Sequence, residues 1–195
     1  MLDYPLDLSF KIVTLGTRVR VTDAAGREVA YLRKKKFRLK EEVTIYTDEA
    51  QNRTLFRIKA DRMLDFSANY SIRDGDGRLL GAVGRRGMRS LWRSSYSIVD
   101  ANGSGIAEIR EENPWIKVAD RALESLPLGD ALGGLFFNPA YLIELRSKPV
   151  LRLRKRRAVL EGRFTLDKLA EIPENEEKIL LASTLMMLIF ERDRG

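Results

Sequence analysis

Three clusters of basic residues are the part of this sequence best suited to binding chemistry. They read RKKKFRLK at 33–40, RRGMRSLWR at 85–93 and RLRKRR at 152–157. Lys and Arg bind phosphate and carboxylate groups, and the nearby rings of Phe37 and Trp92 suit a membrane–water interface. The clusters therefore predict a site for anionic phospholipid or phosphoinositide headgroups. The candidate residues are Arg33, Lys34, Lys35, Lys36, Arg38, Arg85, Arg86, Arg89, Trp92, Arg93, Arg152, Arg154, Lys155, Arg156 and Arg157.

The overall charge agrees with an anionic partner but does not prove one. The 195 residues carry 35 Lys and Arg against 28 Asp and Glu, a net charge of +7. Such an excess favours nucleic acid, anionic lipid or acidic protein. The simpler interpretation is that the clusters are the solvated outer faces of strands, and it is the one we favour from sequence alone.

The chain contains no Cys and no His. A disulfide scaffold, a zinc or iron–sulfur site, a thiol nucleophile and a Ser-His-Asp triad are therefore excluded. Acidic residues fall mainly at predicted turns and in the C-terminal segment, and no Gly-rich phosphate loop is present. We expect no enzymatic activity, no cofactor and no metal.

A second candidate site is the segment 113–139, which separates two groups of predicted strands. It contains a short amphipathic stretch, then the apolar, glycine-bearing LPLGDALGGLFF. Trp115, Phe136 and Phe137 could contact lipid or a protein partner. The alternative, which we favour, is a cap packed over one end of the fold.

Four segments of the chain share one pattern, a short alternating strand followed by Asp, a turn and a second strand. The aspartates are Asp23, Asp48, Asp74 and Asp100, recurring about every 26 residues. Strand segments such as 151–154 alternate Leu with Arg, which indicates one buried and one solvated face. An Asp side chain can bond the following backbone, and Gly supplies the positive φ of tight hairpins. DGDG at 74–77 lacks the later ligands of a calcium loop and is interpreted as a turn.

The C-terminal run ILLASTLMMLIF, residues 179–190, has no charged residue. As a helix it measures roughly 18 Å, against a hydrocarbon core of about 30 Å. The run is thus too short to cross a bilayer and predicts a helix buried on every face. Asn175 is a candidate N-cap, with Glu176 and Glu177 in the first turn. With no signal-peptide pattern at the start, we expect a cytoplasmic protein without a transmembrane span, able to associate peripherally with membranes.

These observations combine into one architecture, a mainly β fold. Ten to twelve hairpin-connected strands can close into a barrel, which removes unpaired edges. A barrel that wide needs more than short side chains to fill it, and a helix at about 176–191 supplies that core. We expect residues 1–195 to form a single domain with the insert 113–139.

The combination resembles the LURP-one-related family, which groups with the Tubby C-terminal domain and the phospholipid scramblases. The resemblance rests on the D-x-x-G hairpins at Asp23–Gly26 and Asp100–Gly103, on GRFTLDK at 162–168 and on the closing apolar run. It implies a twelve-stranded barrel around a central C-terminal helix. Tubby-type domains bind phosphoinositides. The chain lacks the Pro-rich segment, the cysteines and the calcium loop of scramblases.

The sequence leaves several functions open. The first hypothesis is a module that binds anionic lipid headgroups at a membrane surface. The second is a protein-interaction or structural module that uses the apolar insert. Nucleic-acid binding ranks last, because no groove-reading helix or aromatic base-stacking sheet is evident. Nothing in the sequence indicates the oligomeric state.

Overall fold

A computed structural model of the protein describes residues 2–13, 16–35, 42–61, 69–85, 95–112, 140–156 and 162–192. Within these ranges the chain forms strands β1 to β12 and the helix α3. The predicted insert 113–139 lies outside the described residues. The strand bounds are β1 Leu6–Val13, β2 Gly16–Thr22, β3 Glu28–Lys35, β4 Glu42–Tyr46, β5 Thr54–Asp61, β6 Asn69–Asp74, β7 Leu79–Arg85, β8 Ser95–Asp100, β9 Gly105–Glu111, β10 Ala140–Leu145, β11 Lys148–Arg156 and β12 Gly162–Lys168.

The strands form a closed antiparallel barrel in which each strand pairs with its neighbours in the sequence. The barrel closes where β1 pairs with β12, with Leu6 opposite Leu166 and Phe10 opposite Gly162. Closure leaves no unpaired edge among the described strands. The predicted barrel is thereby confirmed, with twelve strands.

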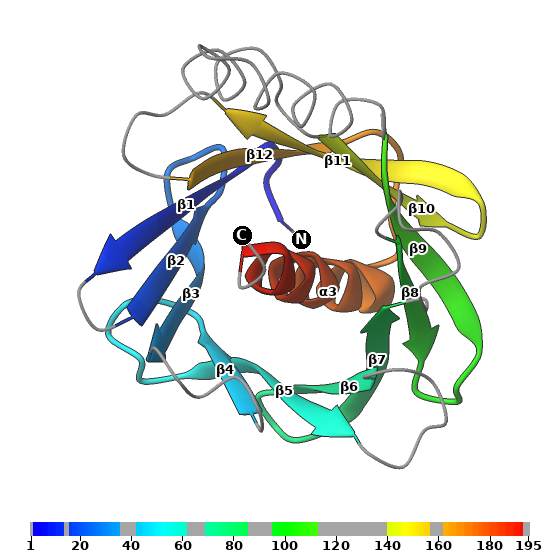
Figure 1. The fold of residues 1–195 in the computed structure, drawn as a ribbon, viewed down its shortest axis with the longest axis horizontal. Helices are drawn as coiled ribbons and strands as arrows, with labels where there is room; N and C mark the ends of the chain where they lie inside the picture. Colours follow the sequence, from blue (N-terminus) through cyan, green and yellow to red (C-terminus); the bar gives the residue numbers. More distant parts are fainter. Residues whose placement is uncertain are drawn as a thin grey trace, which may run out of the picture.

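The helix α3, Glu174–Arg192, lies inside this ring of strands, as Figure 1 shows. Every residue from Ile179 to Ile189 is buried. The apolar run therefore forms the core of the barrel, as predicted, because a helix apolar on all faces must be surrounded on all faces. Thr184 Oγ1 donates to the Leu180 carbonyl at 2.8 Å, one turn back. The Ser183 hydroxyl does not repeat this bond, since it has no partner among the described residues.

The start of α3 differs from the prediction. The carbonyl of Pro173 accepts the backbone N–H groups of Glu176 and Glu177, both at 2.9 Å. Pro173 is therefore the cap, and Asn175 is exposed within the first turn. The prediction of Asn175 as the cap was wrong. It relied on the preference for Asn at this position, whereas here the loop before the helix places the carbonyl of Pro173 where it accepts the first N–H groups of the helix.

The two ends of the barrel differ in their connections. At one end, called the turn end, tight turns at 23–27, 47–53, 74–78, 100–104 and 146–147 join the strands. The other end, called the mouth, is where the odd-numbered strands finish and α3 ends. Near the start of α3, Arg146 Nη1 lies 3.0 Å from Glu176 Oε2, which fixes that part of the helix at the turn end.

The turn aspartates have the predicted backbone role. Asp100 Oδ1 accepts the N–H groups of Asn102 and Ser104, both at 2.9 Å, and Gly103 has a φ of 81°. Asp23 and Asp74 make the same pair of bonds to the residues two and four positions on. The DGDG stretch is therefore a hairpin turn stabilised by the Asp74 carboxylate.

Candidate functional site

The strand topology brings parts of the three basic clusters to the same end of the barrel. The clusters begin near the ends of β3 and β7 and on β11, and all three of these strands finish at the mouth. Arg33 is exposed on β3, and Arg85 is half-buried at the end of β7. Lys34 and Lys35 belong to β3, but their side chains are not described. The candidates outside the described residues are Lys36, Arg38, Arg86, Arg89, Trp92, Arg93, Arg157, Trp115, Phe136 and Phe137.

The cluster on β11 divides between the two faces of the barrel wall. Leu151 and Leu153 are buried against the interior. Because successive side chains alternate between faces, Lys155 follows the row of Leu151 and Leu153 but is exposed at the end of the strand, while Arg152, Arg154 and Arg156 form an outer row. Residues that look continuous in the sequence thus belong to two different environments.

The outer arginines each face a carboxylate from a neighbouring segment. Arg152 Nε lies 2.9 Å from Glu112 Oε2, and Arg154 Nη2 lies 2.8 Å from Asp167 Oδ2. Arg156 Nη1 lies 3.2 Å from Asp7 Oδ1. The hydrogen bond and charge of Asp167 raise the pKa of Arg154 above its ordinary value. These arginines are partly neutralised, as expected for the polar outer face of a strand.

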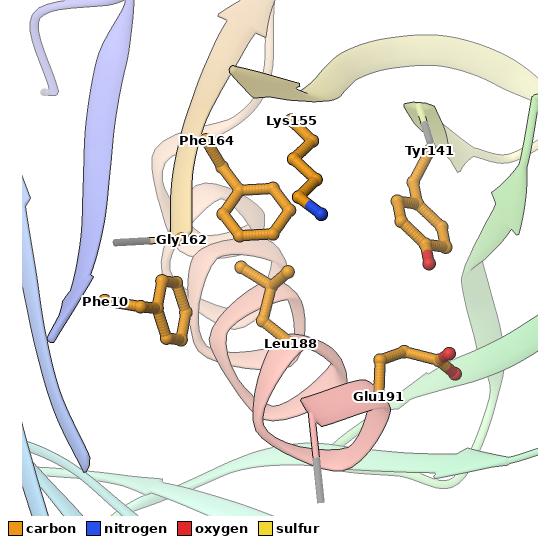
Figure 2. Close-up of a pocket in the computed structure, with 7 residues that line it drawn as sticks. All are labelled: Phe10, Tyr141, Lys155, Gly162, Phe164, Leu188 and Glu191. Carbon is orange, nitrogen blue, oxygen red and sulfur yellow. The ribbon is translucent and has the colours of Figure 1, made fainter. Parts of the chain in front are cut away.

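Lys155 reaches a pocket at the mouth, beside the end of α3. Its volume is about 390 Å³, and its lining comes from β1, β10, β11, β12 and the helix. Figure 2 shows the Lys155 ammonium and the Tyr141 hydroxyl directed into it. The lining residues are Phe10, Tyr141, Lys155, Gly162, Phe164, Leu188 and Glu191.

One side of the pocket is apolar. Phe10 and Phe164 pack edge to face, with ring centroids 5.5 Å apart, and Leu188 projects from the helix beside them. Gly162 lies on the same interior row of β12 as Phe164. A side chain at Gly162 would project toward Phe10, because its Cβ would lie 3.4 Å from the Phe10 Cβ. The glycine therefore leaves space that most residues would fill.

The other side of the pocket carries three polar side chains, those of Glu191, Tyr141 and Lys155. Glu191 Oε1 accepts the Tyr96 hydroxyl at 2.7 Å. Tyr141 is only 4% exposed as a residue, but its hydroxyl is not among the buried polar atoms without a partner, because it opens to the pocket. Lys155 makes no ion pair with a described side chain. The pocket thus presents two groups with unused donors, one cationic and one neutral.

Burial raises the pKa of both tyrosines, which are protonated at physiological pH even at the ordinary tyrosine pKa of about 10. It raises the pKa of Tyr141 well above its ordinary value, and the charges of Glu191 and Glu111 raise it further. Burial and the hydrogen bond to Glu191 act in the same direction on the pKa of Tyr96. Both phenols are therefore neutral hydrogen-bond donors at physiological pH.

The charges of the barrel are distributed unequally between its ends. In the turns, the adjoining strand ends and the first turns of α3, the acidic residues are Asp23, Asp48, Glu49, Asp74, Asp76, Asp100, Glu171, Glu174, Glu176 and Glu177, and the basic ones are Arg27, Arg53, Arg78, Arg146, Lys148, Lys168 and Lys178. Near the mouth, the described basic side chains are Lys11, Arg33, Lys59, Arg85, Lys155, Arg156 and Arg163, and the acidic ones are Glu42, Glu111, Glu112 and Glu191. The turn end is acidic and the mouth is basic.

Comparison with protein families matches residues 8–113 to the family described as LURP-one-related. The chain belongs to the LURP-one-related family. The match runs from β1 to just past β9 and includes both D-x-x-G hairpins that carried the resemblance. The stretch 162–168 and α3 lie beyond it. No curated protein and no solved structure matched the chain.

In this family member, the part of the chain that the structure describes has no helix of the length and apolarity needed to cross a membrane. Among the described side chains, no His, Cys, Asp and Glu group of three or more is placed to hold a metal ion. The mouth pocket, a second pocket of about 570 Å³ lined by Arg152, Arg154 and Arg156, and the basic strand ends are candidates for binding chemistry.

The sequence places Lys155 at the surface with its arginine neighbours, and in the structure it is exposed. It also lines the mouth pocket, on the row of β11 that the alternation of Leu151 and Leu153 marks. Tyr141, Glu191 and Gly162 were not predicted as site residues. They come from strands and a helix far apart in the chain, and no spacing in the sequence relates them.

Proposed function

We propose that the protein is a non-enzymatic binding module for anionic phospholipid headgroups, and that its mouth faces the membrane surface. The observation that carries this proposal is the opposite charge of the two barrel ends. An anionic surface attracts the basic mouth and repels the acidic turn end. The protein would thereby be oriented on the membrane as well as held there.

The strength of such binding depends on how many cations come close to the lipid. Each Lys or Arg near an anionic bilayer contributes about 1 kcal/mol, and salt screens this attraction. Arg33 and Lys59 are exposed near the mouth and make no ion pair with another described residue. The outer arginines of β11 contribute less, because each already has a carboxylate partner.

Vesicle co-sedimentation with a matched pair of double variants tests the orientation. Arg33→Glu with Lys59→Glu reverses two charges near the mouth. Arg53→Glu with Lys148→Glu reverses two exposed charges at the turn end and gives the same net charge. We expect the wild-type protein to sediment with phosphatidylserine-containing vesicles at low salt and less at physiological salt. The mouth variant should lose most of this binding, and the turn-end variant should retain it.

Two results would contradict the proposal. If the wild-type protein bound anionic vesicles at neither low nor physiological salt, the proposed lipid binding would be rejected. An equal loss in both double variants would show that net charge alone, without orientation, explains the binding. Vesicles of phosphatidylcholine alone serve as the uncharged control.

The second candidate function, a protein-interaction module using 113–139, stays a prediction from sequence. That segment lies outside the described residues. A pull-down with and without residues 126–137 checks it, since identical partner profiles would count against the insert.

A further inference from the structure

The mouth pocket supports an inference that does not depend on binding to a membrane surface. We propose that it binds a single-chain amphiphile with an anionic head, the head on Lys155 and Tyr141 and the chain against Phe10, Phe164 and Leu188. The volume of about 390 Å³ falls within the range of about 300–1,000 Å³ common to small-molecule sites.

The position of Lys155 is the first argument. It occupies an interior position of β11, on the row that holds Leu151 and Leu153. Lys155 is nevertheless exposed, because this row reaches the open mouth of the barrel at the end of β11. Lys155 makes no ion pair with a described residue, and Figure 2 shows its ammonium directed into the pocket. An anionic group in the pocket could form an ion pair with this ammonium.

The hydroxyl of Tyr141 is the second, independent argument. Tyr141 as a residue is 4% exposed, but its hydroxyl is not among the buried polar atoms that lack a partner, so it opens to the pocket. Figure 2 shows this hydroxyl on the polar side of the pocket. Because the phenol is neutral, it can donate to a carboxylate or phosphate oxygen beside the ammonium of Lys155.

The hydrogen bond of Glu191 helps to explain why a ligand with a cationic headgroup would not bind in the pocket. Its Oε1 is already occupied by the Tyr96 hydroxyl. The donors without partners are those of Lys155 and Tyr141, so the pocket selects an acceptor. A cationic head would instead have to approach Glu191 while meeting the charge of Lys155, which opposes it.

The apolar wall indicates that the ligand is more than a free anion. Phe10, Phe164 and Leu188 form a surface that gains from contact with a hydrocarbon chain. Gly162 lies beside Phe10 and Phe164 and adds no side chain to this surface. Two headgroups share the required chemistry, the carboxylate of a fatty acid and the phosphate of a single-chain phospholipid.

Isothermal titration calorimetry with soluble probes below their micelle concentrations tests the inference. The probes are octanoate, octyl phosphate, octanol and octylammonium. We expect the wild-type protein to bind at least one of the two anions about tenfold to a hundredfold more tightly than octanol, the range for a hydrogen bond to a charged group. Comparison of octanoate with octyl phosphate distinguishes the two sources. Inorganic phosphate alone should bind more weakly than octyl phosphate.

Variants distinguish the contribution of the anionic headgroup to binding from that of the hydrocarbon chain. Lys155→Met should remove the preference for the anions over octanol, because it keeps the apolar stem and loses the charge. Tyr141→Phe should weaken the anions and leave octanol unchanged. Gly162→Val should weaken every probe, because its side chain would occupy the pocket beside Phe10 and Phe164; the Cβ itself would be in ordinary contact with Phe10 Cβ at 3.4 Å. Lys148→Met, at the other end of β11, is the control and should bind as the wild type does.

Several results would overturn the inference. These are no binding of any probe to the folded wild type, equal binding of octanol and the anions, tighter binding of octylammonium, or an unchanged preference in Lys155→Met. If Gly162→Val melts at a much lower temperature than the wild type, Lys155→Met and Tyr141→Phe still decide the outcome. Vesicle binding could fail while these probes bind, so the two proposals are tested separately.

Discussion

The hydroxyl of Tyr96 on β8 donates a 2.7 Å hydrogen bond to Oε1 of Glu191, close to the end of α3. Phe190 adds to the same junction, since its ring is stacked on Tyr96 with centroids 6.2 Å apart and lies 4.8 Å from the ring of Tyr70. At the other end, the backbone N–H of Leu2 donates to Glu177 at 3.3 Å and Arg146 pairs with Glu176. The helix is therefore attached to the barrel wall at both ends.

Replacing Tyr96 tests the attachment at the mouth. Tyr96→Phe should lower the free energy of unfolding by about 1–2 kcal/mol, because it leaves the Glu191 carboxylate without this donor. Tyr141→Phe removes a hydroxyl that has no described partner and should change stability by no more than about 0.5 kcal/mol. Urea denaturation of both variants checks the difference. Equal losses in the free energy of unfolding for the two variants would show that the hydrogen bond of Tyr96 to Glu191 does not stabilise the protein.

The buried helix predicts a large effect at Leu185, which is 2% exposed. Leu185→Asp should leave the protein unfolded, because an unpaired buried carboxylate costs several kcal/mol, comparable with the whole stability of a domain. Leu169→Asp is the control, since Leu169 is 49% exposed. Circular dichroism and thermal melting report the result. A Leu185→Asp protein that melts at the wild-type temperature would show that the helix is not the core.

Gly81 lets the backbone of β7 and the helix come close together. Its φ is +152°, and an added Cβ would lie 2.5 Å from Cδ1 of Ile179 and in contact with the Val99 carbonyl oxygen. Gly81→Ala should therefore destabilise the protein by about 3 kcal/mol, from overpacking and backbone strain together. Gly105→Ala, with open space around its Cβ, is the matched control. Similar melting temperatures for the two variants would refute this explanation.

The Asp23 turn predicts a pH dependence. Burial by itself would raise the pKa of the Asp23 carboxyl, but hydrogen bonds from Arg27 and Ala25 and the charge of Arg27 outweigh it, so the pKa lies below its ordinary value of 3.8. Because the folded state holds the carboxylate ionised, its contribution to stability is present above the unfolded pKa and is lost as pH falls through the lower folded pKa.

Unfolding measured from neutral pH down to below about pH 4 checks this linkage. Asp23→Asn should be less stable at neutral pH and should lose less stability on acidification than the wild type. Asp76→Asn is the control, because Asp76 is exposed and makes no hydrogen bond or ion pair through its side chain among the described residues. An unchanged acid slope in Asp23→Asn would contradict the argument.

The sequence was sufficient for the fold because its signals are local and repeated. Asp23, Asp74 and Asp100 each form the same turn, and these turns set which strands become neighbours. The apolar run of α3 lacks a polar face, so only an enclosed position satisfies it. The cap at Pro173 was missed, because a backbone carbonyl acts there and no side-chain preference reveals it.

The binding features were only partly predictable. Arg33 and the basic run on β11 were found from composition, but the run was interpreted as one surface. The ion pairs of Arg152 with Glu112 and of Arg156 with Asp7 join β11 to segments 40 and 149 residues away, whereas Arg154 pairs with Asp167 on the next strand. Such pairs depend on which strands close the barrel, and the spacing of charges along the chain does not encode them.

The amino-acid sequence by itself determined the hairpins, the enclosed helix and the family, because backbone turns and apolar periodicity act between residues close in the chain. Only the tertiary structure decided that Lys155 lines one pocket together with Tyr141, Glu191 and Gly162. The physical reason is that the mouth pocket forms only where β1 pairs with β12 and where α3 ends. No single segment of the chain forms this pocket without the others.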